Sequence, residues 1–91
     1  MEICKMLTLS ILHVSPETML FLEEAVESGE VACYEKEGYG FWIFCGVTCI
    51  GSHIPGDLIS LMNLARECDC LWLQLDADGP IEESIPIYER I

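Results

Sequence analysis

The apolar residues of the chain stand in short runs, and two helix-start signals separate these runs. This arrangement restricts the fold more than any other feature of the sequence. No apolar run approaches the roughly 18–20 consecutive residues that a membrane-spanning helix needs. Residues 15–17 (Ser-Pro-Glu) supply an N-cap serine, an N1 proline and a first-turn acid, and Pro55 with Asp57 repeats much of that signal. A chain of 91 residues fits one domain. A single domain over residues 1–91, with two helices between strands, is therefore predicted.

Periodicity places the other elements. Residues 2–14 are rich in β-forming side chains, and residues 6–11 partly alternate between apolar and polar, as a half-buried strand does. The first helix should end at Gly29, a natural helix terminator. Further strands are predicted at residues 31–35, 40–45 and 71–75, with a hairpin turn at 36–39 and an edge strand or extended tail at 85–88. The second helix should bury a stripe at helical spacing, made of Leu58, Leu61, Met62, Ala65 and Cys68.

This order, β-α-β-β-α-β, matches the ferredoxin-like split βαβ pattern. The predicted fold class is therefore α+β, with a sheet of three or four strands and two helices on one face. Residues 41–44 (Phe-Trp-Ile-Phe) are apolar on both sides of their strand. The side away from the core should be covered by a helix, a partner or a second copy of the chain.

Charge is the strongest feature of the composition. Sixteen acidic residues oppose four basic ones, so the net charge is −12 and the isoelectric point is near 4.1. A surface of this sign repels nucleic acid and anionic membranes, and it favours a basic partner such as the groove of a nucleic-acid-binding protein. The acids could instead serve only to keep a small apolar protein in solution.

The acids form two groups along the sequence. Carboxylates on a rigid helix and hairpin can approximate the spacing of phosphates along a nucleic acid, whereas a solvated surface without a partner is the alternative interpretation. The residues predicted to bind a partner are the first group, with two tyrosines as aromatic anchors: Glu23, Glu24, Glu27, Glu30, Glu35, Glu37, Tyr34 and Tyr39. The second group is Glu67, Asp69, Asp76, Asp78, Glu82 and Glu83.

The cysteines are interpreted as reduced thiols. The N-terminus has no basic segment leading into an apolar one, so no signal peptide is expected and the predicted location is the cytoplasm. A four-thiolate zinc site would need Cys45, Cys49, Cys68 and Cys70. The last two are one residue apart, and on a strand they would point to opposite faces. No metal is therefore expected at the thiols.

Catalytic signals are weak. His13 and His53 are each isolated in the sequence, and they are expected at capping or surface positions. No short catalytic or phosphate-binding motif is present. The chain is therefore predicted to be non-enzymatic and to need no cofactor.

Residues 76–79 (Asp-Ala-Asp-Gly) look like the start of a calcium loop. Counted from Asp76, positions six and twelve are Ile81 and Ile87 instead of the glycine and glutamate that such a loop requires. Asp76 and Asp78 could still hold magnesium, or they could form an ordinary solvated turn.

Several short blocks resemble those of a family of small bacterial proteins that is known only as a domain of unknown function. In chain order the blocks are residues 8–18 (TLSxxHVSPET), 38–42 (GYGFW), 54–58 (IPxDL), 76–80 (DxDGP) and 85–88 (IPxY). Members of this family are common on plasmids and prophages, so the resemblance implies a phage or mobile-element protein. The six cysteines and the segment 45–53 depart from the family pattern, and no role for them follows from it.

Three functions stay open. The first is inhibition of a basic host nucleic-acid-binding protein, such as a defence nuclease, by an anti-CRISPR or anti-restriction type of nucleic-acid mimicry. This interpretation includes no direct contact with nucleic acid or membrane. The second is a self-associating regulatory module, a homodimer joined through the strand at residues 41–44. The third is a small metal-dependent enzyme that uses Asp76 and Asp78.

Overall fold

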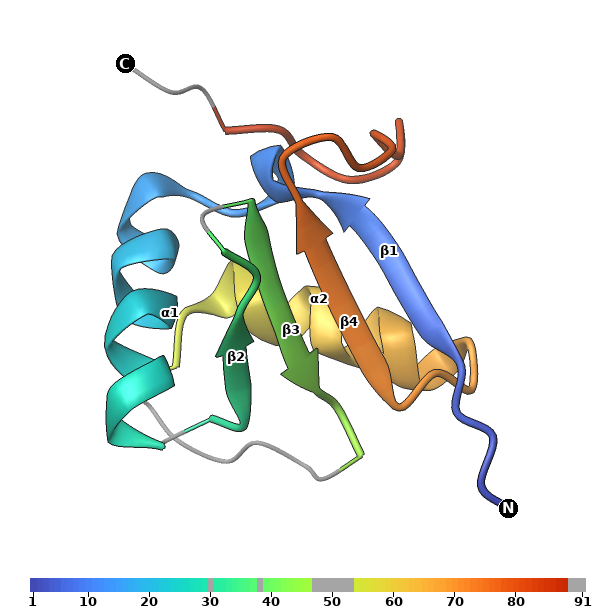
Figure 1. Ribbon diagram of the computed structural model, residues 1–91. Coiled ribbons are helices and arrows are strands. Elements are labelled where there is room, and N and C mark those ends of the chain that lie inside the picture. The colour runs from blue at the N-terminus through green and yellow to red at the C-terminus, as the bar shows by residue number, and fades with distance from the viewer. Residues whose placement is uncertain (30, 38, 47–53, 89–91) are drawn as a thin grey trace.

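The computed structural model describes residues 1–29, 31–37, 39–46 and 54–88 (Figure 1). The elements in chain order are β1 (Met6–Ser10), the 3₁₀ turn η1 (Ile11–His13), α1 (Pro16–Ser28), β2 (Cys33–Glu35), β3 (Gly40–Phe44), α2 (Gly56–Glu67) and β4 (Trp72–Asp76). The predicted β-α-β-β-α-β order and the mixed α+β class are confirmed. Residues 85–88 form an extended tail and no strand.

The first helix begins and ends where the sequence signals lie. The Ser15 hydroxyl oxygen accepts the backbone N–H of Thr18 at 3.2 Å, which satisfies one of the free donors of the first turn. Gly29 caps the other end with a φ of 76°, a left-handed conformation that glycine adopts without a steric penalty. β1 is shorter than predicted, because the Ser10 hydroxyl accepts the N–H of Leu12 at 3.1 Å and turns the chain into η1.

The strand order across the sheet is β1-β4-β3-β2. β1 pairs with β4 in parallel, whereas β3 pairs antiparallel with both β4 and β2. Two strands therefore lie between β1 and β2, the pair that α1 connects. The ferredoxin-like split βαβ arrangement is not confirmed. Alternation along a strand determines which side chains face the core, but it leaves the choice of neighbouring strand open.

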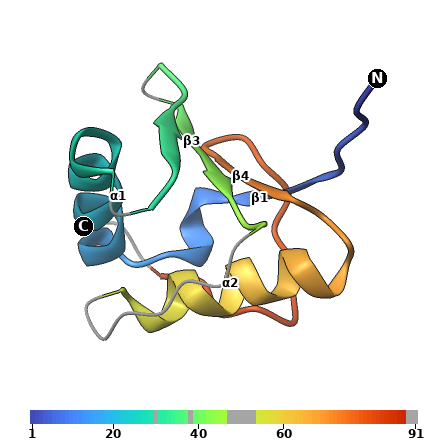
Figure 2. The ribbon, with the colours of Figure 1, turned by 90° about the horizontal axis from the view of Figure 1, so that it is seen from below.

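Both helices contribute to one hydrophobic core. In Figure 1, α2 crosses behind the sheet and α1 lies beside β2; Figure 2 gives the view from below. Ile43, Leu73 and Leu75 point to this side of the sheet and are fully buried, together with Leu22 of α1 and Leu61 of α2. In the described part of the chain no helix covers the other side of the sheet, which we call the open face.

The residues after β4 run back along η1. The His13 side chain is 1% exposed, and its Nε2 accepts the backbone N–H of Glu82 at 2.9 Å. The proton of the neutral ring is therefore on Nδ1, which donates to the carbonyl of Pro86 at 3.0 Å. The expectation of a capping or surface histidine is wrong at this position, because the ring holds residues 82–86 in place. His53 lies outside the described residues.

Candidate functional site

Three glutamates project from the second half of α1. Glu23, Glu24 and Glu27 are exposed, and the last turn of the helix has no basic residue. Glu27 lies in the last turn, where the helix dipole disfavours an acid by about 0.3–1 kcal/mol. Glu23 and Glu27 are also one turn apart, where like charges cost a further ~0.2–0.5 kcal/mol. α1 therefore holds these acids at a cost to its own stability. Glu30 lies outside the described residues.

The hairpin of β2 and β3 brings two more acids to this helix. Glu35 in β2 and Glu37 in the turn are exposed. Glu23 and Glu35 line one hollow of about 60 Å³, with Met19 and Phe41 among the residues around them. The two elements thus share one acidic region, as the position of α1 beside β2 in Figure 1 indicates. We call the exposed acids of these two elements the acidic surface: Glu23, Glu24, Glu27, Glu35 and Glu37. Glu23 and Glu35 meet at its centre, whereas the end of α1 with Glu27 and the hairpin turn with Glu37 lie at opposite ends of it (Figure 1).

No basic side chain neutralises the acidic surface within residues 1–29, 31–37, 39–46 and 54–88. The ion pair found there joins Lys36 to Asp76, which belongs to β4. Lys5 precedes β1, and its ammonium donates to a backbone carbonyl at 3.1 Å. Arg66 is in the last turn of α2. The carboxylates of the acidic surface are therefore available to a partner.

The two tyrosines predicted as anchors lie in different places. Tyr34 is 57% exposed and its ring centre is 6.2 Å from that of Trp72, so it belongs to the open face. Glu35, the next residue along β2, points to the opposite side. The structure thus does not bring Tyr34 together with Glu35. Tyr39 is 60% exposed and follows Glu37 in the hairpin turn, so it can accompany the acidic surface.

The second predicted group of acids does not form a single surface. Glu67 is the last residue of α2 and Asp69 lies between α2 and β4, whereas Asp78 and Glu82 follow the end of β4. A strand of five residues separates the two sets by about 17 Å. The acidic surface differs from this second group, because there α1 and β2 bring the carboxylates of Glu23 and Glu35 to one hollow.

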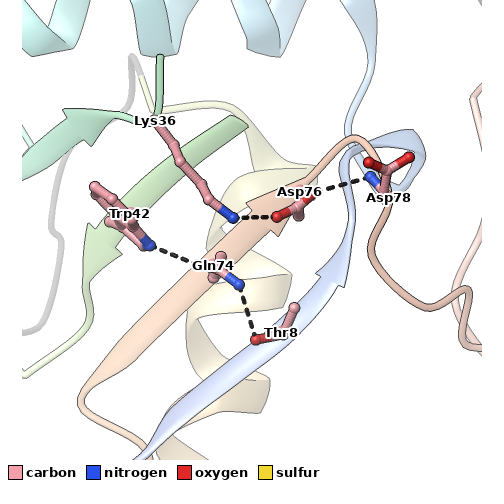
Figure 3. A network of polar contacts seen from close by, with 6 residues as sticks. All are labelled: Thr8, Lys36, Trp42, Gln74, Asp76 and Asp78. Atoms are coloured by element: carbon pink, nitrogen blue, oxygen red, sulfur yellow. Dashed lines mark hydrogen bonds and ion pairs between the residues drawn. The ribbon is translucent and has the colours of Figure 1, made fainter. Parts of the chain in front are cut away.

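Asp76, a predicted magnesium ligand, already has partners within the chain. Its carboxylate accepts hydrogen bonds from the Lys36 ammonium and from the backbone N–H of Asp78, the latter at 2.8 Å (Figure 3). The Lys36 bond, followed by the Asp78 bond, holds the pKa of Asp76 below its usual value. Across the described segments, no three His, Cys, Asp or Glu side chains are grouped so that they could hold a metal ion.

A cavity of about 110 Å³ brings together His13, Asp57 and Ser60. These are the residue types of a hydrolytic triad. The lone pair of His13 Nε2 is already engaged by the N–H of Glu82, so it is not free to take a proton from Ser60. The volume is also below the ~300–1,000 Å³ of ordinary ligand pockets. The cavity therefore does not support hydrolysis.

The described cysteines divide between core and surface. Cys68, which the helical stripe predicted to be inside, follows the last residue of α2 and is exposed. Cys4 is also exposed, whereas Cys33, Cys45 and Cys70 are buried. The proposed zinc set included Cys49, which lies outside the described residues.

Cys33 gives a test of this burial. Burial, and secondarily the charge of Glu35, raises the pKa of its thiol from 9.0 to about 12. Below pH 9 the thiol is neutral in both the folded and the unfolded chain. Between pH 9 and 12 it ionises only in the unfolded chain, so the folded protein loses stability as the pH rises through this range. We expect the wild type to lose about 1.5 kcal/mol more than Cys33→Ala between pH 9 and about 10.5. Urea unfolding measures both, and equal losses would contradict a buried neutral thiol.

These features define the class of the protein: a small α+β domain in which the described residues form an acidic surface without ion pairs and no assembled metal or hydrolytic site. Residues 6–90 match a family described as "Family of unknown function (DUF5983) C-terminal domain". The chain belongs to this family, and the predicted membership of a family of unknown function is confirmed. No curated protein and no solved structure matches the chain. No described helix has both the length and the apolar character that crossing a membrane requires.

Proposed function

We propose that this protein is non-enzymatic and binds the positively charged surface of a host nucleic-acid-binding protein through its acidic surface. The observation that carries the proposal is the position of Glu23, Glu24 and Glu27. All three are exposed, and no ion pair in the described residues neutralises them. Glu27 lies in the last turn of α1, where the helix dipole disfavours an acid, and Glu23 repels it from one turn away. A surface kept at a cost to the fold is expected when a partner supplies the missing positive charge.

The acidic surface would act by occupying the place of nucleic acid. Glu23 and Glu27 are one turn apart, with about 5–6 Å between their Cβ atoms, and Glu35 continues the series across the shared hollow. Both α1 and the hairpin are fixed by the sheet and core, so the carboxylates are already arranged before binding. Pre-arranged charges lose little conformational entropy when they meet a basic groove. The exposed ring of Tyr39, two residues after Glu37 in the hairpin, offers an apolar contact beside that acid.

The kind of host partner is a further part of the proposal. The likeness to proteins that are common on plasmids and prophages favours a defence nuclease, inhibited in the cytoplasm in the manner of an anti-CRISPR or anti-restriction protein. Such nucleases hold their nucleic acid in a positively charged channel, which is the surface that rigid carboxylates can occupy. Neither nucleic acid nor an anionic membrane suits a chain of net charge −12.

The test is a pull-down from a nuclease-treated bacterial lysate at 50 and 500 mM NaCl, with mass spectrometry of the retained proteins. At low salt we expect the wild type to retain a basic nucleic-acid-binding protein. The variant E23K/E24K/E27K should retain at least tenfold less of it. The same variant should be about as stable as the wild type, because E27K suits the helix dipole while E23K and E27K together replace one like-charged pair with another.

The matched control is E2K/E67K/E83K, which reverses three exposed acids elsewhere. Each reversal adds two charges, so both variants have a net charge of −6 instead of −12. Retention by the control should resemble that of the wild type. Equal losses in the two variants would mean that only net charge matters, and retention that survives 500 mM NaCl would count against a mainly electrostatic contact.

A further inference from the structure

The open face of the sheet is aromatic. Side chains alternate along each strand, so Tyr34, Trp42, Phe44 and Trp72 point away from the core. The Phe44 and Trp72 rings meet edge to face with centres 5.2 Å apart, and the Tyr34 ring is 6.2 Å from that of Trp72. Figure 1 looks onto this face, with α2 on the far side of the sheet. Rings from three adjacent strands thus form one cluster on the uncovered side.

Most polar groups of the open face have partners inside the chain. The indole N–H of Trp42 donates to the Gln74 side-chain oxygen at 2.6 Å, and the Gln74 amide donates to the Thr8 hydroxyl at 3.3 Å. Lys36 and Asp76 pair with each other, so their charges cancel (Figure 3). A surface on which most hydrogen bonds are closed and the charge is cancelled can be buried while leaving few polar groups unpaired.

These properties decide what can cover the face. A basic protein would need a free carboxylate on the open face, but the carboxylate of Asp76 is already bound by Lys36. A nucleic acid could stack on the rings, but a chain of net charge −12 repels its phosphates. A second copy of the chain brings an equally neutral aromatic surface, and an isologous contact places each ring cluster against the other. We propose that two copies associate face to face through the open face.

The size of the sheet indicates a weak dimer. Three strands of five residues and one of three, about 4.8 Å apart, span about 19 Å across the sheet and up to about 17 Å along it, or roughly 300 Å² in projection at most. Stable interfaces bury about 800 Å² on each partner, so we expect dissociation at tens of micromolar. The two copies also repel each other through their net charge, and salt screens this repulsion. Self-association should therefore strengthen with salt, whereas binding of a basic partner should weaken.

The experiment is sedimentation velocity from about 5 to 500 µM protein at 50 and 500 mM NaCl. The matched variants are Tyr34→Glu on the open face and Leu20→Glu on α1, because the two side chains are 57% and 62% exposed and the changes add the same charge. Both should keep the wild-type far-UV circular dichroism. We expect the wild type and Leu20→Glu to dimerise alike, and Tyr34→Glu to need at least tenfold more protein.

Fluorescence locates the contact directly, because both tryptophans of the chain, Trp42 and Trp72, are on the open face. Acrylamide quenching of the wild type should fall as the dimer forms and stay constant for Tyr34→Glu. A wild type that stays monomeric at 500 µM in 500 mM NaCl would overturn the proposal. So would a dimer with unchanged quenching, or equal weakening by the two variants. Binding of a basic partner is measured below the dimerisation range, so either proposal can fail alone.

Discussion

Gly40→Ala is expected to destabilise the protein by about 3 kcal/mol or more, because β3 could no longer approach β4. Gly40 pairs with Asp76, and a Cβ atom added to it would lie 1.8 Å from the carbonyl oxygen of Leu75. The obstacle is backbone of a central strand, so no side chain can rotate away. A domain of this size has a total free energy of unfolding of about 5–13 kcal/mol, so such a loss lowers the melting temperature by roughly 15 °C or more.

Gly56→Ala is the control for this experiment. Gly56 is the first residue of α2, and an added Cβ has no neighbour within 4 Å. Alanine is a better helix former than glycine, so this variant should melt at the wild-type temperature or slightly above it. Thermal unfolding followed by circular dichroism compares the two. A melting temperature for Gly40→Ala within a few degrees of the wild type would contradict the close approach of β3 and β4.

Asp57→Ala is expected to cost about 3–5 kcal/mol, because one carboxylate joins the N-termini of both helices. Its Oδ2 accepts the N–H of Ser15 at 2.9 Å, and its Oδ1 accepts the Thr18 hydroxyl at 2.6 Å and the N–H of Leu58 at 2.9 Å. Hydrogen bonds to a charged acceptor contribute about 1.5–3 kcal/mol each. Thr18 is only 1% exposed, so its hydroxyl would be left without this acceptor in the interior.

Two further variants make this prediction specific. Asp57→Asn keeps one acceptor oxygen but turns an N–H₂ group toward donors, so it should lose roughly half as much stability. Glu67→Ala removes an exposed acid from the other end of α2 and should change stability by less than about 0.5 kcal/mol. Urea unfolding of the three variants gives the comparison. A loss below about 1 kcal/mol for Asp57→Ala would mean that the two helix ends are held by other contacts.

The elements could be predicted from the sequence because their signals are local. The serine cap at Ser15 and the glycine stop at Gly29 lie next to the helix that they delimit. Strand order had no such signal, since nothing within β1 indicates that β4 will be its neighbour. The same limit applies to Asp57. The sequence indicated only that its carboxylate, in the first turn of a helix, interacts favourably with the helix dipole. Its bond to Ser15 joins residues 42 positions apart.

The candidate site was only partly open to prediction. Charge counts indicated Glu23, Glu24 and Glu27, but not the hollow that one of them shares with Glu35. The position of Tyr34 could have been inferred, because strand alternation puts it on the opposite side from Glu35. The hydrogen-bond partners of His13 could not have been inferred, because its ring binds backbone groups that lie 69 and 73 positions further along the chain.

The blocks that resemble the family mainly hold the fold together. His13 in the first block binds the backbone of Pro86 in the last, and Asp57 of the third block binds Ser15 and Thr18 of the first. In the fourth block, a Cβ on Gly79 would lie 2.5 Å from a carbonyl oxygen of β1. The five residues of the acidic surface lie outside these blocks. The blocks that resemble the family therefore account for the fold. The proposed function depends on acidic residues outside those blocks.

Competition with nucleic acid tests the central claim most directly. The captured partner is loaded with a fluorescent DNA duplex, and the anisotropy is followed as each form of the protein is added. The proposed mimicry predicts that the wild type and E2K/E67K/E83K release the duplex at similar concentrations, and that E23K/E24K/E27K needs at least tenfold more. A stable complex that contains the partner, the duplex and this protein together would contradict it.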